Sequence, residues 1–237
     1  MKIKTLARLI VYGDIHGCLD ELTLLRHKIG IRSDDIEVCV GDVITKGANS
    51  VKTLKYLRKK GIFSVLGNHE ETIIRYIHHV KTTKKRNPIK IDKDQKNIIK
   101  NLSYKDIDFL ESLPYFIQYE GYVIVHGGLQ NDMNLSNLSM RDKSKMIRLR
   151  YLSQKGRFIS YGKETKNSIF WSDVYDGKNG FVIFGHNKFK EPKISPHAIG
   201  IDTGCVYGNK LTAFIVEDGK RRFESVNFGE RDESSYI

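Results

Sequence analysis

Short apolar segments recur along the chain, and each stops at a glycine next to a polar residue. They are rich in Val, Ile, Leu, Phe and Tyr, residue types that favour strands. These runs span residues 7–14, 36–42, 62–69, 122–128, 181–187 and 198–204, and a similar run at 211–219 ends at an ordinary turn. Because they are continuously apolar rather than alternating, they predict strands that are buried on both faces.

Three segments with helical spacing of their apolar residues lie between the early strands. They span residues 19–29, 49–60 and 70–80. Alternation of strand and helix predicts an α/β fold. After residue 181 the predicted strands follow one another with little helix between them. This pattern predicts a second, more antiparallel sheet packed on the first.

We expect a single domain over residues 1–237, because no internal repeat and no Pro- or Gly-rich linker divides the chain. Polar segments interrupt the predicted strands at about 81–113 and 129–160. The first is predicted to add helices over the core, and the second surrounds a short basic helix. Both lie between core strands, where loops can rim a pocket.

The composition is that of a packed protein, with 40% hydrophobic and 29% charged residues, and it excludes a disordered chain. No apolar run approaches the roughly 18 residues of a membrane-spanning helix, so we expect no membrane association. The N-terminal apolar stretch runs into a charged motif and is predicted to be a strand rather than a signal peptide. Three scattered cysteines, Cys18, Cys39 and Cys205, predict a reducing, cytoplasmic location and no disulfide framework.

The net charge of +12 is concentrated in two places. Residues 81–100 carry eight Lys/Arg and two Asp, and residues 141–157 carry seven Lys/Arg and one Asp, which gives +6 for each segment. Such clusters mark a phosphate-rich partner, or they are solvated faces produced by Lys-rich codon usage. Charge alone leaves both explanations open.

Side chains that bind metals follow the predicted strands repeatedly. They are Asp14, His16, Asp42, Asn68, His126 and His186, with His69 beside Asn68. One Gly-Asp pair alone is common turn chemistry. Several strands ending this way indicate a metal site, in which glycine lets the backbone approach the ligand closely. Mixed Asp oxygen and His nitrogen donors favour first-row transition metals, and six ligands exceed one tetrahedral site, so we expect two metals. No Walker A loop or dinucleotide fingerprint is present.

The order of these motifs resembles a known family. GDIHG (13–17), GDVITKG (41–47), GNHE (67–70), HGG (126–128) and GH (185–186) are similar to the five-block signature of calcineurin-like metallophosphoesterases. Within that superfamily the chain most resembles the diadenosine tetraphosphatase (ApaH) and ApaH-like branch of the phosphoprotein-phosphatase group. The resemblance implies a four-layer α/β/β/α sandwich with two mixed β-sheets and a dinuclear metal centre at its edge.

Carried over by position, the resemblance assigns roles to the predicted ligands. Asp14, His16 and Asp42 would bind the first metal ion, and Asn68, His126 and His186 would bind the second together with a bridging Asp42. The ions would be divalent Mn, Fe, Zn or Co, with Mn expected in vitro. His69 matches the proposed general acid of the family. A hydroxide that bridges the metals is the expected nucleophile, and metal binding does lower the pKa of water to about 7.

The second motif departs from the protein-phosphatase pattern GDxVDRG. Thr45 replaces an Asp that would orient the acid histidine, so His69 is expected either to have a lower pKa or to rely on Glu70 or another carboxylate. Lys46 replaces an Arg and keeps the charge without the bidentate fork. Arg148 and Arg150 match an R-x-R motif, and because alternate positions of a strand point oppositely, we expect only one of them to reach phosphate.

These features together predict a phosphohydrolase of dinucleoside polyphosphates or related nucleotide anhydrides. A phosphoprotein Ser/Thr phosphatase is an alternative of the same class, against which the Thr45/Lys46 pair argues. An RNA 5′-end (cap) processing hydrolase with RNA as partner is another alternative, and it predicts RNA affinity that falls steeply with salt. DNA-specific binding is not expected, and a pseudoenzyme is disfavoured because all six ligands are present.

Overall fold

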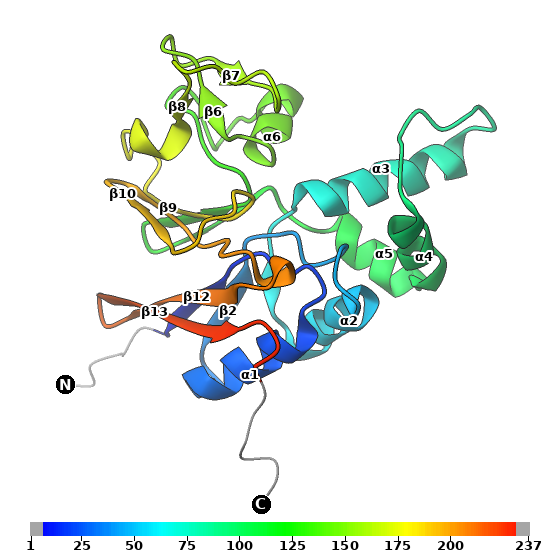
Figure 1. Cartoon of the computed structure of the whole chain (residues 1–237), viewed down its shortest axis with the longest axis horizontal. Helices are drawn as coiled ribbons and strands as arrows, with labels where there is room; N and C mark the ends of the chain where they lie inside the picture. Colours follow the sequence, from blue (N-terminus) through cyan, green and yellow to red (C-terminus); the bar gives the residue numbers. More distant parts are fainter. Residues whose placement is uncertain (1–6, 231–237) are drawn as a thin grey trace, which may run out of the picture.

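Two five-stranded mixed sheets lie face to face in the computed structural model, which describes residues 7–230 (Figure 1). The first sheet has the order β13 (Lys220–Asn227), β12 (Lys210–Glu217), β1 (Leu9–Tyr12), β2 (Ile36–Cys39) and β3 (Phe63–Ser64). Within it β1, β2 and β3 are parallel, and β12 runs antiparallel to β1 and to β13. The outer limits of the predicted domain, 1 and 237, lie outside the described residues.

The second sheet has the order β10 (Lys193–Ser195), β11 (Ala198–Gly200), β9 (Phe181–Phe184), β5 (Tyr122–Val125) and β4 (Phe116–Tyr119). Its three central strands are parallel, and the two edge strands are antiparallel to their neighbours. The predicted strands are therefore found, but the expected division between sheets is wrong at the C-terminus. Strands β12 and β13 return to the first sheet, where β12 extends the hydrogen bonding of β1.

The apolar runs are buried on both faces, as their composition predicts. In β1, Leu9 and Val11 belong to the core between the two sheets, whereas Ile10 and Tyr12 pack towards the helices. Successive side chains of a strand point to opposite faces, so one short strand contributes to two cores. This double burial holds the strand ends in fixed positions.

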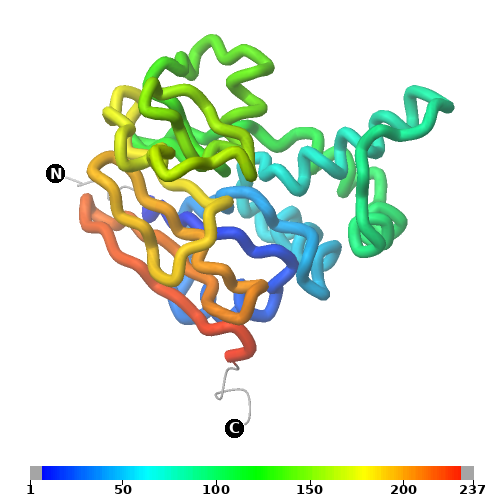
Figure 2. Tube along the Cα trace, turned by 45° about the horizontal axis from the view of Figure 1, so that its top comes forward, coloured from blue at the N-terminus to red at the C-terminus, as the bar shows by residue number. Residues whose placement is uncertain are grey.

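Helices cover the outer face of the first sheet. They are α1 (Leu19–Ile29), α2 (Ser50–Lys60), α3 (Asn68–Thr82), α4 (Lys93–Asn101) and α5 (Tyr104–Glu111), and apolar side chains from all five join one core cluster with β1 and β12. Helix α1 buries Leu22, Leu25 and Ile29 at spacings of three and four residues and ends at Gly30 in the left-handed conformation. The end of α3 and the loop after it project from the body of the molecule (Figures 1 and 2).

The outer face of the second sheet is covered by shorter elements. They are α6 (Met140–Met146), the 3₁₀ turn η1 (Trp171–Asp173) and a small sheet of order β7 (Phe158–Ile159), β6 (Tyr151–Leu152) and β8 (Ile169–Phe170). The two mixed sheets between outer layers confirm the expected sandwich, although this outer layer contains more loop and short strand than helix. Within residues 7–230, no helix is both long and apolar enough to span a membrane.

Candidate active site

The predicted ligand residues lie in the loops that follow five strands, at one edge of the sandwich. Asp14 and His16 follow β1, Asp42 follows β2, Asn68 and His69 begin α3 after β3, and His126 and His186 follow β5 and β9. These strands are parallel neighbours within their own sheets, so their carboxyl ends meet, which is where α/β folds place their ligands. Both sheets therefore contribute to one site.

The carboxylate of Asp42 lies at the centre of this site. Its Oδ2 is 3.5 Å from His16 Nε2 and 3.3 Å from His126 Nε2. Two groups of possible metal ligands result, His16–Asp42–His69 and Asp42–His126–His186, and they share Asp42. Burial raises the pKa of Asp42, but the surrounding His126 and His69 outweigh burial and hold it well below its usual value.

Asp14 belongs to neither of these two groups. Its two carboxylate oxygens accept the backbone N–H of His186 at 3.1 Å. Burial and the negative charge of nearby Asp202 raise the pKa of Asp14. Three buried carboxylates, those of Asp14, Asp42 and Asp202, therefore influence one another, and a cation near them would relieve their repulsion.

The histidines are fixed so that Nε2 faces the centre. Backbone carbonyls contact His16 Nδ1 (Ile44 O, 3.1 Å) and His126 Nδ1 (Val40 O, 2.8 Å). Hydrogen bonds of this kind set the tautomer of metal-binding histidines. Burial also lowers the pKa of His16 to about 3, so its ring stays neutral.

The surroundings of His126 provide a test of whether the site suits a metal ion. Its Nδ1 faces a carbonyl, and its Nε2 faces Asn68 Oδ1 at 2.9 Å and Asp42 Oδ2. Both ring nitrogens thus face only acceptors, so a positive charge between Nε2 and these oxygens is favourable. In the protein alone that charge is a proton. Burial lowers the pKa of His126, but Asp42 more than compensates and raises it to about 9. A divalent cation fits the same three atoms, and the N/O donor set suits a first-row transition metal.

The backbone of the site is conformationally unusual. Among residues 7–230, seven non-glycine residues have positive φ, and five of them belong to this site: His16, Asp42, Thr45, Lys46 and His186. Such conformations cost energy and persist where the surrounding structure enforces them, often at functional sites. The glycines before the ligands are also required, because a Cβ on Gly67 or Gly185 would lie 2.2 Å from Asp42 Oδ1 or 2.0 Å from Asp14 Oδ1.

His69 contacts Thr45 rather than the side chain of Glu70. Thr45 Oγ1 lies 2.7 Å from His69 Nδ1, which orients the ring without adding charge. The Glu70 carboxylate instead accepts backbone N–H groups of Asp42, Ile44 and Gly67, so of the two alternatives expected for His69 the structure does not show reliance on Glu70. Burial lowers the pKa of His69, which agrees with the other expected consequence of Thr45.

Lys46 reaches the centre from the side of His16. Its Nζ donates to His16 Nε2 at 2.8 Å and lies 5.2 Å from the centre of the Tyr207 ring. These contacts, rather than burial, place the ammonium next to the ligand groups, because Lys46 is exposed, and a lysine lacks the fork of an arginine. Lys46 thus provides a fixed positive charge at the centre.

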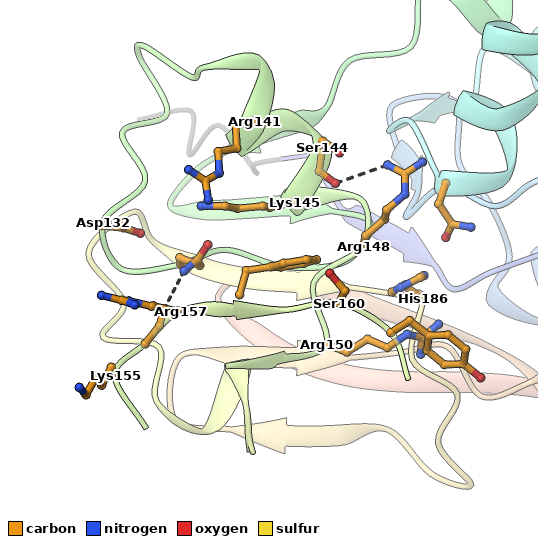
Figure 3. Close-up of a pocket in the computed structure, with 15 residues that line it drawn as sticks. Asp132, Arg141, Ser144, Lys145, Arg148, Arg150, Lys155, Arg157, Ser160 and His186 are labelled. Atoms are coloured by element: carbon orange, nitrogen blue, oxygen red, sulfur yellow. Dashed lines mark hydrogen bonds between the residues drawn. The ribbon is translucent and has the colours of Figure 1, made fainter. Parts of the chain in front are cut away.

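A basic cleft of about 1040 Å³ opens from Asn68 and His186 (Figure 3). Six cationic side chains line it: Arg141, Lys145, Arg148, Arg150, Lys155 and Arg157. Arg148 and Arg150 lie at the end near His186, whereas Arg141, Lys155 and Arg157 lie at the opposite end (Figure 3). Both Arg148 and Arg150 line the cleft, because they belong to an irregular segment after α6 rather than to a strand, so the alternation of a strand does not separate them; that only one of them reaches phosphate stays a prediction.

The partners of these two arginines were not expected from the sequence. Arg148 pairs with Glu71 at 2.5 Å, and Arg150 Nη1 donates to Asn187 Oδ1 at 2.7 Å. The guanidinium of Arg150 also lies over the Tyr161 ring. Glu71 and Asn187 directly follow the GNHE and GH motifs. Their position next to a motif is the one feature of the sequence that could have identified them as residues of the site.

Comparisons with known proteins agree with this geometry. The model of the calcineurin-like phosphoesterase family matches residues 7–218. The asymmetrical bis(5'-nucleosyl)-tetraphosphatase PrpE of Bacillus velezensis is 31% identical over 230 residues, with 86% of this chain and 87% of the relative covered. The protein of the same name from Oceanobacillus iheyensis is 29% identical, with 86% of each chain covered.

Solved structures share the fold. A crystal structure described as a candidate diadenosine tetraphosphatase matches 95% of this chain and 96% of its own at 23% identity, with a TM-score of 0.78. A metallophosphoesterase from Sphaerobacter thermophilus matches with a TM-score of 0.57 at 16% identity, covering 93% of this chain and 89% of its own. The resemblance inferred from the motifs is confirmed. Since the family model spans most of its length, the chain belongs to the calcineurin-like phosphoesterase family and is a hydrolase of phosphoester or phosphoanhydride bonds.

Proposed function

We propose that this protein hydrolyses a dinucleoside polyphosphate such as diadenosine tetraphosphate, or a related nucleotide phosphoanhydride. The basic cleft carries the proposal. A phosphate monoester needs cations only around one phosphorus, whereas this cleft continues past Arg148 and Arg150 to Arg141, Lys155 and Arg157. A linear polyphosphate has charge along such a path, and the names of the curated relatives support this substrate class.

Residues at the near end of the cleft would hold the reacting phosphate. Arg148 and Arg150 would grip its oxygens with guanidinium groups that Glu71 and Asn187 hold in place. Asn68 and Lys46 would contact the same phosphate from the other side. Pre-positioned charges of this kind stabilise developing negative charge without reorganisation during the reaction.

His69 would give a proton to the leaving oxygen. In hydrolysis a water oxygen forms the new bond to phosphorus, the bond to the leaving phosphate oxygen breaks, and that oxygen takes up a proton. The hydroxyl of Thr45 orients the ring through Nδ1, so that Nε2 is the atom available for transfer. Electrostatic support of the protonated ring would come from Asp42, whose Oδ2 is 3.9 Å from His69 Nε2.

We propose two divalent metal ions, drawn from Mn, Fe, Zn and Co, as cofactors. Asp14, His16 and Asp42 would hold one, and Asp42, Asn68, His126 and His186 the other. Bound ions of this type supply Lewis-acid activation of phosphate and of water. The two possible ligand groups support the shared place of Asp42 and the roles of His16, His126 and His186, whereas the first group contains His69 where this assignment has Asp14.

The test is an activity comparison of Mn²⁺-loaded protein on diadenosine tetraphosphate, capped RNA, a phosphopeptide and p-nitrophenyl phosphate. We expect the highest kcat/KM on the dinucleotide and a loss of about 10³-fold or more with Asp42→Asn, which removes charge from the centre. A higher kcat/KM on the phosphopeptide or the capped RNA would replace the proposal by a phosphoprotein phosphatase or an RNA-end hydrolase. Activity on none of the four substrates, or activity on the dinucleotide that Asp42→Asn leaves unchanged, would overturn it.

A further inference from the structure

A second group of potential metal ligands lies where α1 begins, outside the candidate active site. One sulfur each from Cys18 and Cys205 and one carboxylate oxygen of Glu21 lie within 4.8 Å of one another. Cys18 directly precedes α1, Glu21 belongs to its first turn, and Cys205 begins η2 (Cys205–Tyr207). All three residues are buried, with exposed fractions of 5%, 7% and 1% for Cys18, Glu21 and Cys205.

The carboxylate distinguishes this group from ordinary core packing. Two buried thiols alone behave as small apolar side chains. Glu21 is different, because its Oε1 accepts only the neutral backbone N–H of Gly229 as a described hydrogen bond, at 3.0 Å. A buried carboxylate is costly unless a positive charge compensates it. The group therefore combines two soft sulfur donors with a negative charge that a cation would neutralise.

The group can be reached from the surface. Cys18 and Glu21 line a cavity of about 480 Å³. Asp20 and Glu230 also border this cavity, so that with Glu21 three carboxylates line its wall against the single cation Lys46. A cation could thus be attracted to the opening and reach Cys18 and Glu21 from the cavity.

We propose that Cys18, Glu21 and Cys205 form a binding site for a thiophilic divalent cation of the Zn²⁺/Cd²⁺ class. Zn²⁺ binds thiolate and carboxylate in tetrahedral geometry, where ligand atoms are roughly 3.5–4 Å apart, and the separation of these three groups is compatible with that spacing. The fourth position would face the cavity and hold water. Binding replaces two S–H bonds by two metal–sulfur bonds and releases two protons to solvent, so no oxidant is required.

A cation bound here would link two segments of the chain that lie next to residues of the candidate active site. Cys18 lies two residues after His16, and Cys205 lies three residues after Asp202. A cation held by both sulfurs would join the loop after β1 to the turn after β11.

The experiment uses Mn²⁺-loaded full-length protein titrated with Cd²⁺ without added thiol reagent. The ultraviolet thiolate-to-Cd²⁺ charge-transfer band reports sulfur ligation only, and the candidate active site contains no sulfur ligand. We expect a band that saturates at one Cd²⁺ per chain, disappears in Cys18→Ser and in Cys205→Ser, and needs about tenfold more Cd²⁺ in Glu21→Gln. Cys39→Ser is the matched control, because Cys39 is a buried cysteine of β2 outside the group, and it should keep the full band.

Several results would overturn the proposal. They are absence of the band in the wild type, persistence in Cys205→Ser, or loss of the band in a folded Cys39→Ser. If the two serine variants fail to fold by circular dichroism, Glu21→Gln decides, and unchanged Cd²⁺ affinity there counts against the site. None of these outcomes depends on phosphohydrolase activity.

Discussion

Two segments of the chain carry the same net charge of +6, but the fold uses them differently. In residues 81–100 all eight Lys and Arg side chains are exposed. In residues 141–157 four of the seven are half-buried, and six line the basic cleft. The first segment follows α3 into a projecting loop and α4, while the second wraps the outer face of the second sheet beside His186 (Figures 1 and 3).

The difference lies in the partners of each cation rather than in their number. Arg148 and Arg150 are fixed by Glu71 and Asn187, so their charge points to a defined place. Exposed lysines such as Lys84 and Lys85 keep their charge in solvent, where it is screened within about 10 Å at ordinary ionic strength. The two basic clusters therefore differ in whether neighbouring side chains hold them against a cleft, and net charge does not reveal this difference.

The largest expected effect comes from the two fixed arginines. Replacing both, Arg148→Ala with Arg150→Ala, should lower kcat/KM on diadenosine tetraphosphate by about 10³-fold, because pre-positioned donors near the reacting phosphate are lost. Steady-state kinetics of the purified variant measure this change.

The matched control removes the same number of charges from the other segment. Lys84→Ala with Lys85→Ala should change kcat/KM by less than about twofold, since surface charges beyond a Debye length are largely screened. Equal losses in the two double variants would break the comparison, because charge count and not placement would then explain substrate binding.

Substituting one buried residue in each segment tests how much that segment contributes to stability and to substrate binding. Ile98 is the buried residue of α4 and packs in the helix-side core, so Ile98→Ala should cost about 2–4 kcal/mol of unfolding free energy without altering KM. Met146→Ala in α6 should cost a similar amount and also raise KM, because the cavity left by the buried side chain lets α6 shift, and with it the Met146 carbonyl that accepts the N–H groups of Gly127 and Gly128 beside His126. Denaturant unfolding and kinetics on the same preparations test both. Asp94 of α4 accepts the backbone N–H of Lys46, so a raised KM in Ile98→Ala would show that this contact of the first segment contributes to substrate binding.

The fold was largely predictable from the sequence, because doubly buried strands need continuous apolar runs. The helix predicted at 19–29 has the observed bounds of α1, and glycine after each strand marked where it ends. Strand β13 was missed because its sequence KRRFESVN is charged, and pairing with β12 rather than burial stabilises it. Assignment of β12 to the first sheet depends on long-range pairing with β1, which no local pattern encodes.

For the candidate site, motifs predicted which residues meet, whereas side-chain contacts required coordinates. The ligand types gathered at the strand ends as expected, because parallel strands end at one edge. That Thr45 rather than Glu70 contacts His69 depends on the positive φ of Thr45, and a sequence does not show that angle. Orientation of Arg148 and Arg150 likewise depends on an irregular backbone to which strand alternation does not apply.

A smaller effect is expected at the far end of the cleft. Lys155→Ala with Arg157→Ala should raise KM for diadenosine tetraphosphate about tenfold and leave p-nitrophenyl phosphate unchanged, because only the longer substrate extends past Arg148. The difference between the two substrates, measured at several salt concentrations, is the informative quantity. Equal effects on both substrates would mean that these cations do not contact a polyphosphate, while the arginines near His186 could still do so.

The smallest effects concern the helix caps that each inserted segment carries. Asp106 closes the capping box of α5 with Ser103, and Asp142 closes that of α6 with Ser139. Burial raises the pKa of Asp106, but its hydrogen bonds with Ser103 and the nearby Arg58 hold it below its usual value. The hydrogen bond with Ser139 lowers the pKa of Asp142.

A carboxyl with a depressed pKa in the folded state contributes stability that is present above its unfolded pKa, about 4, and is lost as pH falls through the folded value. Asp106→Asn should therefore cost about 1–3 kcal/mol at pH 7, since Asp106 is fully buried beside Arg58, and this cost should shrink below pH 4. Asp142→Asn should cost only about 0.5–1 kcal/mol, because solvent screens a cap that is partly exposed. Thermal unfolding of both variants between pH 7 and pH 3 measures the two differences. Equal costs would indicate that α6 is as firmly buried as α5, and the cleft-lining segment would then be part of the rigid core rather than a layer added over it.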